Sequence, residues 1–344
     1  MMKEKTMKAA VLEQFKTPLK IQEVPIPEPN EDEVLIKIKA SALCVSDLHI
    51  QDGIIKSVQV PYIPGHEMAG EVVEVGSKVK DLKVGDRVLV HIDIVCGKCR
   101  HCKEGKTNLC ENLTRIGFER DGSHAQYCKA PQECVFKIGD MKYEYAACLM
   151  DAVGCMYNAI KEQGKVKKGD RVLILGCGGI GMNAIKIAKL FGAEVYTTSR
   201  KDSKLEVAKE LGADAVINTA KEDLAEAIKR ITEGKLCDVI IDNIGIKTSV
   251  NEAVHLVRPG GKVLVAGYND PFFEVDYQEV MKFEKEIIGI RGVMRRDVPE
   301  IIDLVRDGKL EPYIYDVMPF EKINEALQIM RDGKNFGRIV LKMD

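Results

Sequence analysis

The sequence has no tryptophan, no long apolar run and no excess of either charge. Aromatic residues make up only 6% of the 344 residues, a scarcity that excludes no class of function. The 51 basic residues nearly balance the 53 acidic ones, which argues against nucleic acid or another polyanion as a partner. No run approaches the roughly 18 apolar residues of a membrane span, and the first five residues lead into no signal-peptide core. We therefore expect a cytoplasmic protein that binds neither membranes nor nucleic acid.

Four of the eleven cysteines are closely spaced, and no secretion signal suggests a disulfide framework. They are Cys96, Cys99, Cys102 and Cys110. Four thiolates at this spacing can close a tetrahedral site around zinc within one loop, and a site with four protein ligands has no open position. The spacing therefore predicts a structural zinc. Reactive free thiols and an iron–sulfur cluster are the alternatives.

The length of the chain predicts two domains, because 344 residues are many for one core. The pattern of secondary structure also changes along the chain. The first part shows short β segments separated by turns, which predicts an all-β, barrel-like domain. From Val172 strands and helices alternate, which predicts a doubly wound α/β domain. A last strand, Arg338–Lys342, is expected to return to the first domain. We place the first domain at residues 1–153 and 296–344, and the second at 154–295. Helices are expected over Ser203–Leu211, Asp223–Thr232, Pro299–Asp307 and Phe320–Asp332.

The second domain opens with a strand, a glycine turn, a helix and a second strand. The apolar run Val172–Leu175 predicts a buried parallel strand, and apolar residues then recur at helical spacing up to Leu190. Glycines in such a turn let the backbone approach a pyrophosphate, and the helix N-terminus offers free N–H groups to the anion. This context predicts a dinucleotide site. Its residues are Gly176, Gly178, Gly179, Ile180 and Gly181.

A second metal site is indicated by a cysteine and a histidine in the β-rich part. Cys44 ends one β segment, and His66-Glu67 opens another. One Cys, one His and a carboxylate, joined by water or substrate, make an open zinc site that polarises an alcohol oxygen. From spacing alone, a lone Cys and His in a β domain would usually be part of the core.

The motifs together carry a resemblance that covers essentially the whole chain. One motif is the signature Gly65-His66-Glu67-x-x-Gly70, which continues to Gly76 and Val79. With the four cysteines, the glycine turn and the closing segment Gly337–Lys342, it makes the sequence resemble the zinc-containing medium-chain alcohol dehydrogenases. The resemblance implies a GroES-like barrel as the catalytic domain and a Rossmann domain for the cofactor.

The resemblance also implies the catalytic ligands. Cys44 and His66 match two zinc ligands, and the remaining ligand position falls on Asp151. Many alcohol dehydrogenases of the family have a Cys there, and polyol and threonine dehydrogenases a Glu. Aspartate has the carboxylate chemistry but a shorter arm, so Glu67 is expected to share or exchange the role. Asp47 would fix the tautomer of His66.

For proton release, the resemblance assigns a relay of two residues. Ser46 is the hydroxyl two residues after the cysteine ligand, and His49 matches the outer histidine. A surface role for His49 is the alternative.

The end of the second strand of the Rossmann domain predicts the cofactor. Enzymes that prefer NAD usually place a carboxylate there, but this chain has Ser199 followed by Arg200, with Lys204 one helical turn later. A hydroxyl and a guanidinium can bind a 2′-phosphate, so we expect NADP to be preferred over NAD. The alternative is that Arg200 stacks on adenine and NAD is used. Further expected cofactor contacts are Ala266, Gly267 and, by resemblance, the pyrophosphate-contacting Arg338.

The sequence is therefore interpreted as a zinc-dependent dehydrogenase that interconverts a small or medium alcohol and its aldehyde or ketone. A polyol, sugar-alcohol or threonine-type dehydrogenase is the alternative within the family. A zinc-free quinone reductase or a non-catalytic nucleotide-binding relative is disfavoured, because the cysteine lobe and the Cys44/His66 pair are both present. The family implies a homodimer or homotetramer, with sheet edges near Ile287–Val293 pairing across a two-fold axis.

Overall fold

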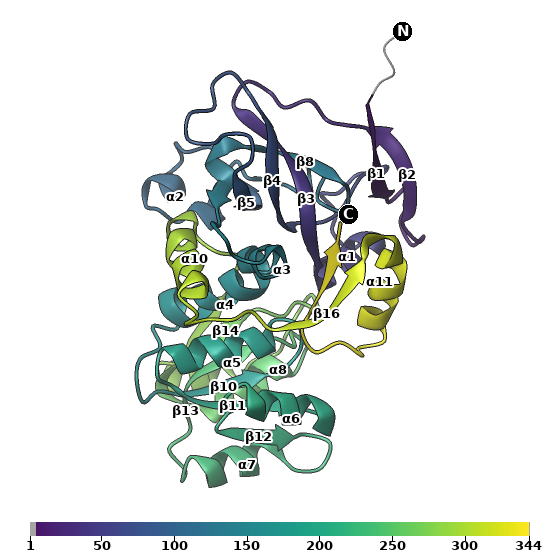
Figure 1. Ribbon diagram of the computed structural model, residues 1–344. Helices are drawn as coiled ribbons and strands as arrows, with labels where there is room; N and C mark the ends of the chain where they lie inside the picture. The colour runs from purple at the N-terminus through teal and green to yellow at the C-terminus, as the bar shows by residue number, and fades with distance from the viewer. Residues whose placement is uncertain (1–4, 344) are drawn as a thin grey trace. The chain divides into compact units, whose positions relative to one another are not determined.

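The computed structural model describes residues 5–343, and these form two compact units (Figure 1). The first unit comprises residues 5–151, Val293–Gly308 and 314–343. The second comprises Ala152–Gly292 together with the short segment Lys309–Tyr313. The sequence placed the two boundaries two and three residues later, and it did not assign Lys309–Tyr313 to the second domain.

The first unit is rich in β-structure. Its main sheet has seven strands in the order β16-β17-β3-β4-β5-β9, with β8 paired to β3. The β16–β17 pair is parallel and the other pairs are antiparallel. The unit also contains two separate two-stranded antiparallel sheets, β1–β2 and β6–β7. Its strands are β1 (Thr6–Val11), β2 (Lys20–Pro25), β3 (Glu33–Leu43), β4 (Glu67–Val75), β5 (Arg87–Val90), β6 (Asp93–Ile94), β7 (Thr114–Arg115), β8 (Tyr127–Pro131), β9 (Val135–Lys137), β16 (Ile314–Pro319) and β17 (Arg338–Lys342).

Several helices accompany these strands, and the two expected after residue 296 are confirmed. They are α10 (Val298–Arg306) and α11 (Ile323–Arg331), the second preceded by the 3₁₀ turn η6 (Phe320–Lys322). The others are α1 (Val45–Gln51), α2 (Arg100–Lys103), α3 (Tyr143–Ala147), the 3₁₀ turns η1 (Thr107–Leu109), η2 (Gln132–Cys134) and η5 (Arg295–Asp297), and the π-helix η3 (Leu149–Val153), which crosses the boundary.

Helix α1 corrects one expectation, because the segment after Cys44 was read only as the end of a β segment. Strand β3 ends at Leu43, and Cys44 is the N-cap of α1. The Asp47 carboxylate accepts a hydrogen bond from the Cys44 N–H at 2.8 Å and so satisfies a free donor at the helix start. The local sequence thus turns the chain sharply at the first predicted metal ligand.

The second unit confirms the doubly wound prediction. Its six strands are all parallel and lie in the order β12-β11-β10-β13-β14-β15. The order reverses between β10 and β13, where open α/β sheets bind ligands at the carboxyl ends of the strands. The elements are β10 (Arg171–Leu175), β11 (Glu194–Ser199), β12 (Ala215–Asn218), β13 (Cys237–Asp242), β14 (Val257–Val265), β15 (Glu286–Gly289), α4 (Gly154–Tyr157), the π-helix η4 (Asn158–Gln163), α5 (Gly181–Leu190), α6 (Asp202–Glu210), α7 (Leu224–Ile231), α8 (Ser249–Leu256) and α9 (Tyr277–Lys282).

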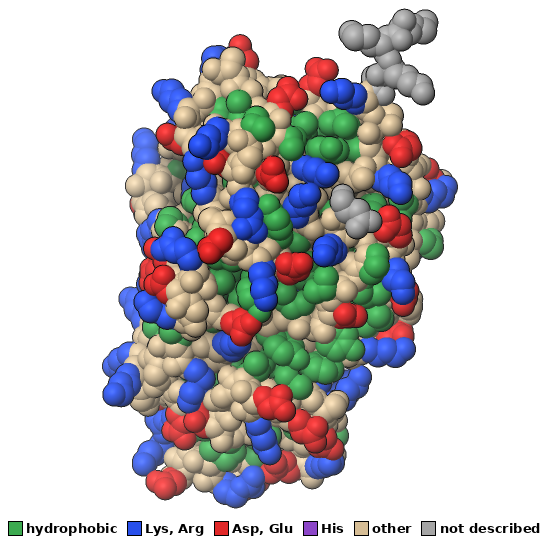
Figure 2. Space-filling view, in the orientation of Figure 1, with side chains coloured by type: hydrophobic (Ala, Val, Ile, Leu, Met, Phe, Trp, Pro, Cys, Tyr) green, Lys and Arg blue, Asp and Glu red, His purple; other side chains and the backbone are tan. Residues whose placement is uncertain are grey.

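Within residues 5–343 no helix is long and apolar enough to cross a bilayer. Figure 2 shows Lys and Arg side chains interspersed with Asp and Glu over the face that it presents. This mixture agrees with the balanced composition.

Candidate active site

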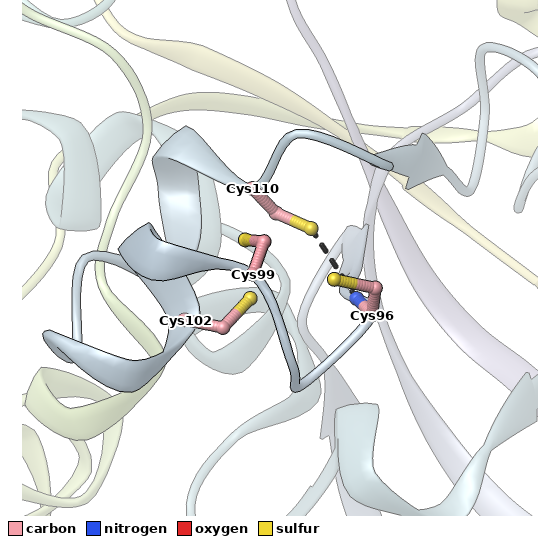
Figure 3. A group of neighbouring side chains, drawn as sticks. All are labelled: Cys96, Cys99, Cys102 and Cys110. Atoms are coloured by element: carbon pink, nitrogen blue, oxygen red, sulfur yellow. Dashed lines mark hydrogen bonds between the residues drawn. The ribbon is translucent and has the colours of Figure 1, made fainter.

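The four-cysteine loop folds into a compact lobe that brings its four side chains together (Figure 3). The four sulfur atoms lie within 4.8 Å of one another. Cys99 is the N-cap of α2, Cys102 lies within that helix, and Cys110 follows the turn η1. The Cys96 N–H also donates to the Cys110 sulfur at 3.3 Å. The sulfur positions fit a closed tetrahedral zinc site.

Electrostatics in the lobe also favour a cation. Hydrogen bonds from the backbone N–H groups of Lys98 and Cys99 lower the pKa of Cys96 to about 6, so this thiol ionises near neutral pH. Burial, together with the neighbouring Cys99 and Cys110, raises the pKa of Cys102 to about 12. Four crowded thiols therefore cannot all ionise unaided, and a bound metal ion would supply the missing positive charge.

We expect the replacement Cys99→Ser to reduce stability more than chemistry, because this metal has no open position for a substrate. The variant should lose one zinc per chain and melt about 5–10 °C lower, as a loss of a few kcal/mol implies for a domain of this size. Elemental analysis and calorimetry measure both quantities. Full zinc content with an unchanged melting temperature would show that Cys99 is not a ligand.

A second cluster joins Cys44, His66, Glu67 and Asp151, whose ligand atoms also lie within 4.8 Å of one another. Cys44 stands between β3 and α1, Glu67 begins β4 directly after His66, and Asp151 lies in the π-helix η3. The Asp151 Oδ2 atom is 3.1 Å from the Cys44 sulfur and 3.9 Å from His66 Nε2. The short arm of aspartate therefore reaches the other donors. Sulfur, imidazole and carboxylate donors at this spacing fit zinc.

Arg338, in β17, lies against these acidic ligands and is only 2% exposed. Its Nε is 2.9 Å from Glu67 Oε1, and its Nη2 pairs with Asp151 Oδ2. Burial alone would raise the pKa of Asp151, but His66 and Arg338 together hold that pKa well below its usual range. The Asp151 carboxylate is thus kept ionised beside the other metal ligands. The expected contact of Arg338 with a pyrophosphate remains a prediction.

The predicted relay residues lie on α1, one helical turn apart. The Ser46 hydroxyl is 3.6 Å from the Cys44 sulfur. His49 is half-buried, and this burial lowers its pKa despite the opposing charge of Asp52. An imidazole with a lowered pKa is neutral near pH 7 and able to accept a proton.

Sequence reasoning missed Phe118, whose ring centroid is 4.9 Å from that of His66. It also missed His124 and Ser41, which lie fully buried behind the ligand histidine. These residues belong to separate β segments and turns, so no local spacing identifies them. The glycine Gly65 was the one available signal, because a Cβ there would lie 2.7 Å from His124 Nδ1.

In the second unit the glycine turn joins β10 to α5. Gly176 has φ +86°, a conformation that favours glycine, and a Cβ at Gly181 would collide with the Gly176 carbonyl oxygen. At Gly178, in contrast, an added Cβ would meet no atom within 4 Å. The fold itself therefore does not require glycine at this position. The open space fits the close approach of a pyrophosphate, with Gly179 and Ile180 leading into the helix N-terminus.

The other predicted cofactor residues lie at the carboxyl ends of the strands. Ser199 ends β11 next to β10, and Lys204 lies in α6. Burial raises the pKa of Cys177, in the glycine turn, while Ser199 and Lys204 beside it oppose that rise. Arg200 is exposed, and among residues 5–343 no hydrogen bond or ion pair engages its guanidinium.

Ala266 and Gly267 follow β14 at the same edge of the sheet. Both of their N–H groups donate to the Asp242 carbonyl at 2.9 Å. The structure thus gathers these residues, the glycine turn, Ser199 and Lys204 at the carboxyl ends of the strands of one sheet.

Comparisons with known proteins agree with both units. A model described as the alcohol dehydrogenase GroES-like domain matches residues 30–140, and one described as zinc-binding dehydrogenase matches residues 179–307. An alcohol dehydrogenase of Geobacillus stearothermophilus is 38% identical over 98% of this chain and 100% of its own length. A D-arabitol-phosphate dehydrogenase of Enterococcus avium is 35% identical over 90% of this chain and 89% of its own. An L-threonine 3-dehydrogenase of Rhizobium etli is 32% identical, covering 97% of this chain and 98% of its own.

Solved structures give the same picture. A crystal structure of an NAD-dependent alcohol dehydrogenase superposes with a TM-score of 0.93 at 28% identity, covering 98% of this chain and all of its own. A protein of Sinorhizobium meliloti described as a zinc-binding dehydrogenase, bound to NADP, superposes with a TM-score of 0.89 at 28% identity, again over 98% and 100%.

Proposed function

The chain belongs to the zinc-containing medium-chain alcohol dehydrogenase family, and we propose that it reversibly oxidises a small or medium alcohol with NADP as the preferred acceptor. It is an oxidoreductase that uses a nicotinamide cofactor, as its relatives and neighbours indicate. The observation that carries the proposal is the convergence of Cys44, His66 and Asp151 in the GroES-like unit. The product would be the corresponding aldehyde or ketone.

Cys44, His66 and Asp151 would hold the catalytic zinc, and Glu67 is close enough to exchange with Asp151. A zinc ion at this position stabilises negative charge on an alcohol oxygen. Arg338 pairs with both carboxylates and so offsets the one negative charge that the two-plus ion would leave. The role of the arginine is to let two carboxylates stay ionised in a buried site.

Ser46 and His49 would carry the proton that leaves the alcohol. The Ser46 hydroxyl, next to the Cys44 sulfur, accepts the proton on the inner side, and His49 passes it outward from the next turn of α1. The lowered pKa of His49 keeps Nδ1 or Nε2 available as an acceptor at neutral pH.

The preference for NADP is supported by the side chains at the end of β11. Ser199 stands where a carboxylate would repel the 2′-phosphate, and the exposed Arg200 is available to pair with it. Half-buried Lys204 adds a second cation close to the glycine turn. NAD would bind more weakly, because it has no 2′-phosphate for these cations to contact.

A polyol, sugar-alcohol or threonine-type substrate is the second candidate. Asp151 provides a carboxylate ligand, as Glu does in such family members, and an arabitol-phosphate and a threonine dehydrogenase are among the relatives. The two metal clusters argue against a zinc-free quinone reductase. Kinetics with primary and secondary alcohols, polyols, a polyol phosphate and threonine, each with NAD and NADP, separates these candidates. Turnover of none of them with either cofactor would contradict the proposal.

We also propose a homodimer or homotetramer in the cytoplasm, a reducing compartment that suits two thiolate sites. Strand β15 is an edge of its sheet, and pairing two such edges would satisfy their backbone groups. We expect light scattering at micromolar concentration to report two or four times the 38.3 kDa of one chain. A monomer would exclude this arrangement.

A further inference from the structure

A buried polar chain extends inward from the ligand histidine of the catalytic cluster. It consists of His66, Asp47, His124, Ser41 and Ser123, each between 0% and 3% exposed. Ser41 Oγ lies 2.7 Å from Ser123 Oγ and 3.0 Å from His124 Nδ1. His124 Nε2 lies 3.5 Å from Asp47 Oδ1. The same Asp47 oxygen lies 3.8 Å from His66 Nδ1.

The three atoms at the centre of this chain point to a common function. Asp47 Oδ1, His66 Nδ1 and His124 Nε2 are all buried, and none forms a hydrogen bond. The other Asp47 oxygen is occupied by the Cys44 N–H at 2.8 Å. Asp47 Oδ1 is thus left between two imidazoles, slightly beyond hydrogen-bond distance of each. Because buried polar atoms are rarely left unpaired, we assign Asp47 Oδ1 as the partner of both imidazoles.

The donor and the acceptor of each hydrogen bond between these side chains can then be assigned. A carboxylate only accepts, so both imidazoles donate to Asp47 Oδ1. With zinc bound, His66 would carry its proton on Nδ1 and offer the Nε2 lone pair to the metal. His124 carries its proton on Nε2, and its Nδ1 accepts from Ser41, whose oxygen accepts from Ser123. Every member of the chain has a partner in this arrangement.

The ring of His124 has little room to move. Its backbone N–H donates to the Pro64 carbonyl at 2.9 Å, and its carbonyl accepts from Ala10 N–H at 2.8 Å. The ring packs on Gly65, the residue before the ligand histidine, where a Cβ would lie 2.7 Å from Nδ1. His124 is therefore a fixed donor aimed at Asp47.

We infer that His124 is a positioning residue for the catalytic zinc: it holds the Asp47 carboxylate in place, and Asp47 in turn fixes the tautomer and orientation of His66. The inference rests on the proposed function, because it presupposes zinc at His66. His124 contacts neither substrate nor cofactor in this role. Groups that orient a metal-bound histidine typically change metal affinity by about 10–100-fold when removed.

Two amide variants separate positioning from packing. In His124→Gln the amide nitrogen can replace Nε2 and donate to Asp47, whereas in His124→Asn it can replace only Nδ1 and reach Ser41. The measurements are the zinc dissociation constant of the catalytic site, by competition with a chromophoric chelator, and the visible spectrum of the site loaded with Co²⁺. Melting temperature and the zinc content of the four-cysteine lobe report on folding.

We expect His124→Asn to weaken zinc binding at the catalytic site about 10–100-fold and to shift the Co²⁺ bands, while His124→Gln stays within about threefold of the wild type. Ser41→Ala, a smaller change, should weaken binding less than His124→Asn. Equal affinities for wild type, His124→Gln and His124→Asn would overturn the inference, and so would equal losses in both amide variants. If the wild type took up zinc only in the four-cysteine lobe, the proposed function would fail together with the inference; two zincs with an unaffected His124→Asn variant would overturn the inference alone.

Discussion

The His66→Ala enzyme is expected to bind one zinc per chain instead of two and to lose at least about a thousandfold in kcat/KM. The reason is that His66 is the nitrogen donor in a cluster whose other donors are a thiol and two carboxylates. Its loss leaves the acidic ligands and Arg338 to pair among themselves, and no cation remains to stabilise charge on the alcohol oxygen. That stabilisation is worth several kcal/mol, and about 4 kcal/mol corresponds to a thousandfold in rate.

His255→Ala is the matched control for this variant. The His255 side chain is about half exposed on α8, far along the chain from either cysteine-containing cluster. Its removal should leave zinc content and kcat/KM unchanged. Elemental analysis and initial-rate kinetics on both variants make the comparison. A His66→Ala enzyme with two zincs and wild-type kcat/KM would place the catalytic metal elsewhere.

The replacement Ser199→Asp is expected to reverse the cofactor preference, so that NAD is used at a lower concentration than NADP. The new carboxylate would repel the 2′-phosphate but accept a hydrogen bond from the free ribose hydroxyl of NAD. Arg200→Ala should raise the Michaelis constant for NADP about ten- to hundredfold and leave that for NAD nearly unchanged. This range corresponds to the loss of one charge-assisted contact of roughly 1.5–3 kcal/mol.

Arg230→Ala is a suitable control for the Arg200 variant. Arg230 lies in the last turn of α7, and the chain then enters the start of β13. The backbone of Arg230 is therefore on the side of the amino ends of the strands, away from the glycine turn. Its loss should change neither Michaelis constant. Paired kinetics with both cofactors at saturating alcohol measure these effects. An equal loss for NAD and NADP in Arg200→Ala would mean that Arg200 contacts adenine or the fold, and the preference for NADP would have to be abandoned.

The predictions from sequence succeeded where a feature is local in the chain. The strand β10, the glycine turn and helix α5 follow one another directly, so buried apolar residues and helical spacing were sufficient to place them. The four cysteines lie within one loop, and their spacing alone predicted sulfur atoms that converge.

What could not be predicted depends on long-range contacts. Strand β17 places Arg338 beside Glu67 and Asp151, residues that are far apart in the sequence, so nothing near Arg338 indicates its partners. Helix α1 escaped prediction because it is short and begins at the metal ligand itself. The π-helix that carries Asp151 has no distinct sequence pattern, so it could not be predicted. It is the element that brings the aspartate, which is shorter than glutamate, within reach of the other donors.

The central claim is that a zinc ion held by Cys44, His66 and Asp151 makes this chain an alcohol dehydrogenase. The most direct test follows alcohol-dependent reduction of NADP while the metal is removed and returned. The account predicts two zincs per chain, loss of activity in step with removal of the zinc at Cys44, His66 and Asp151, and recovery when one equivalent of zinc is added back. Full turnover of the alcohol by protein stripped of both zincs would contradict it.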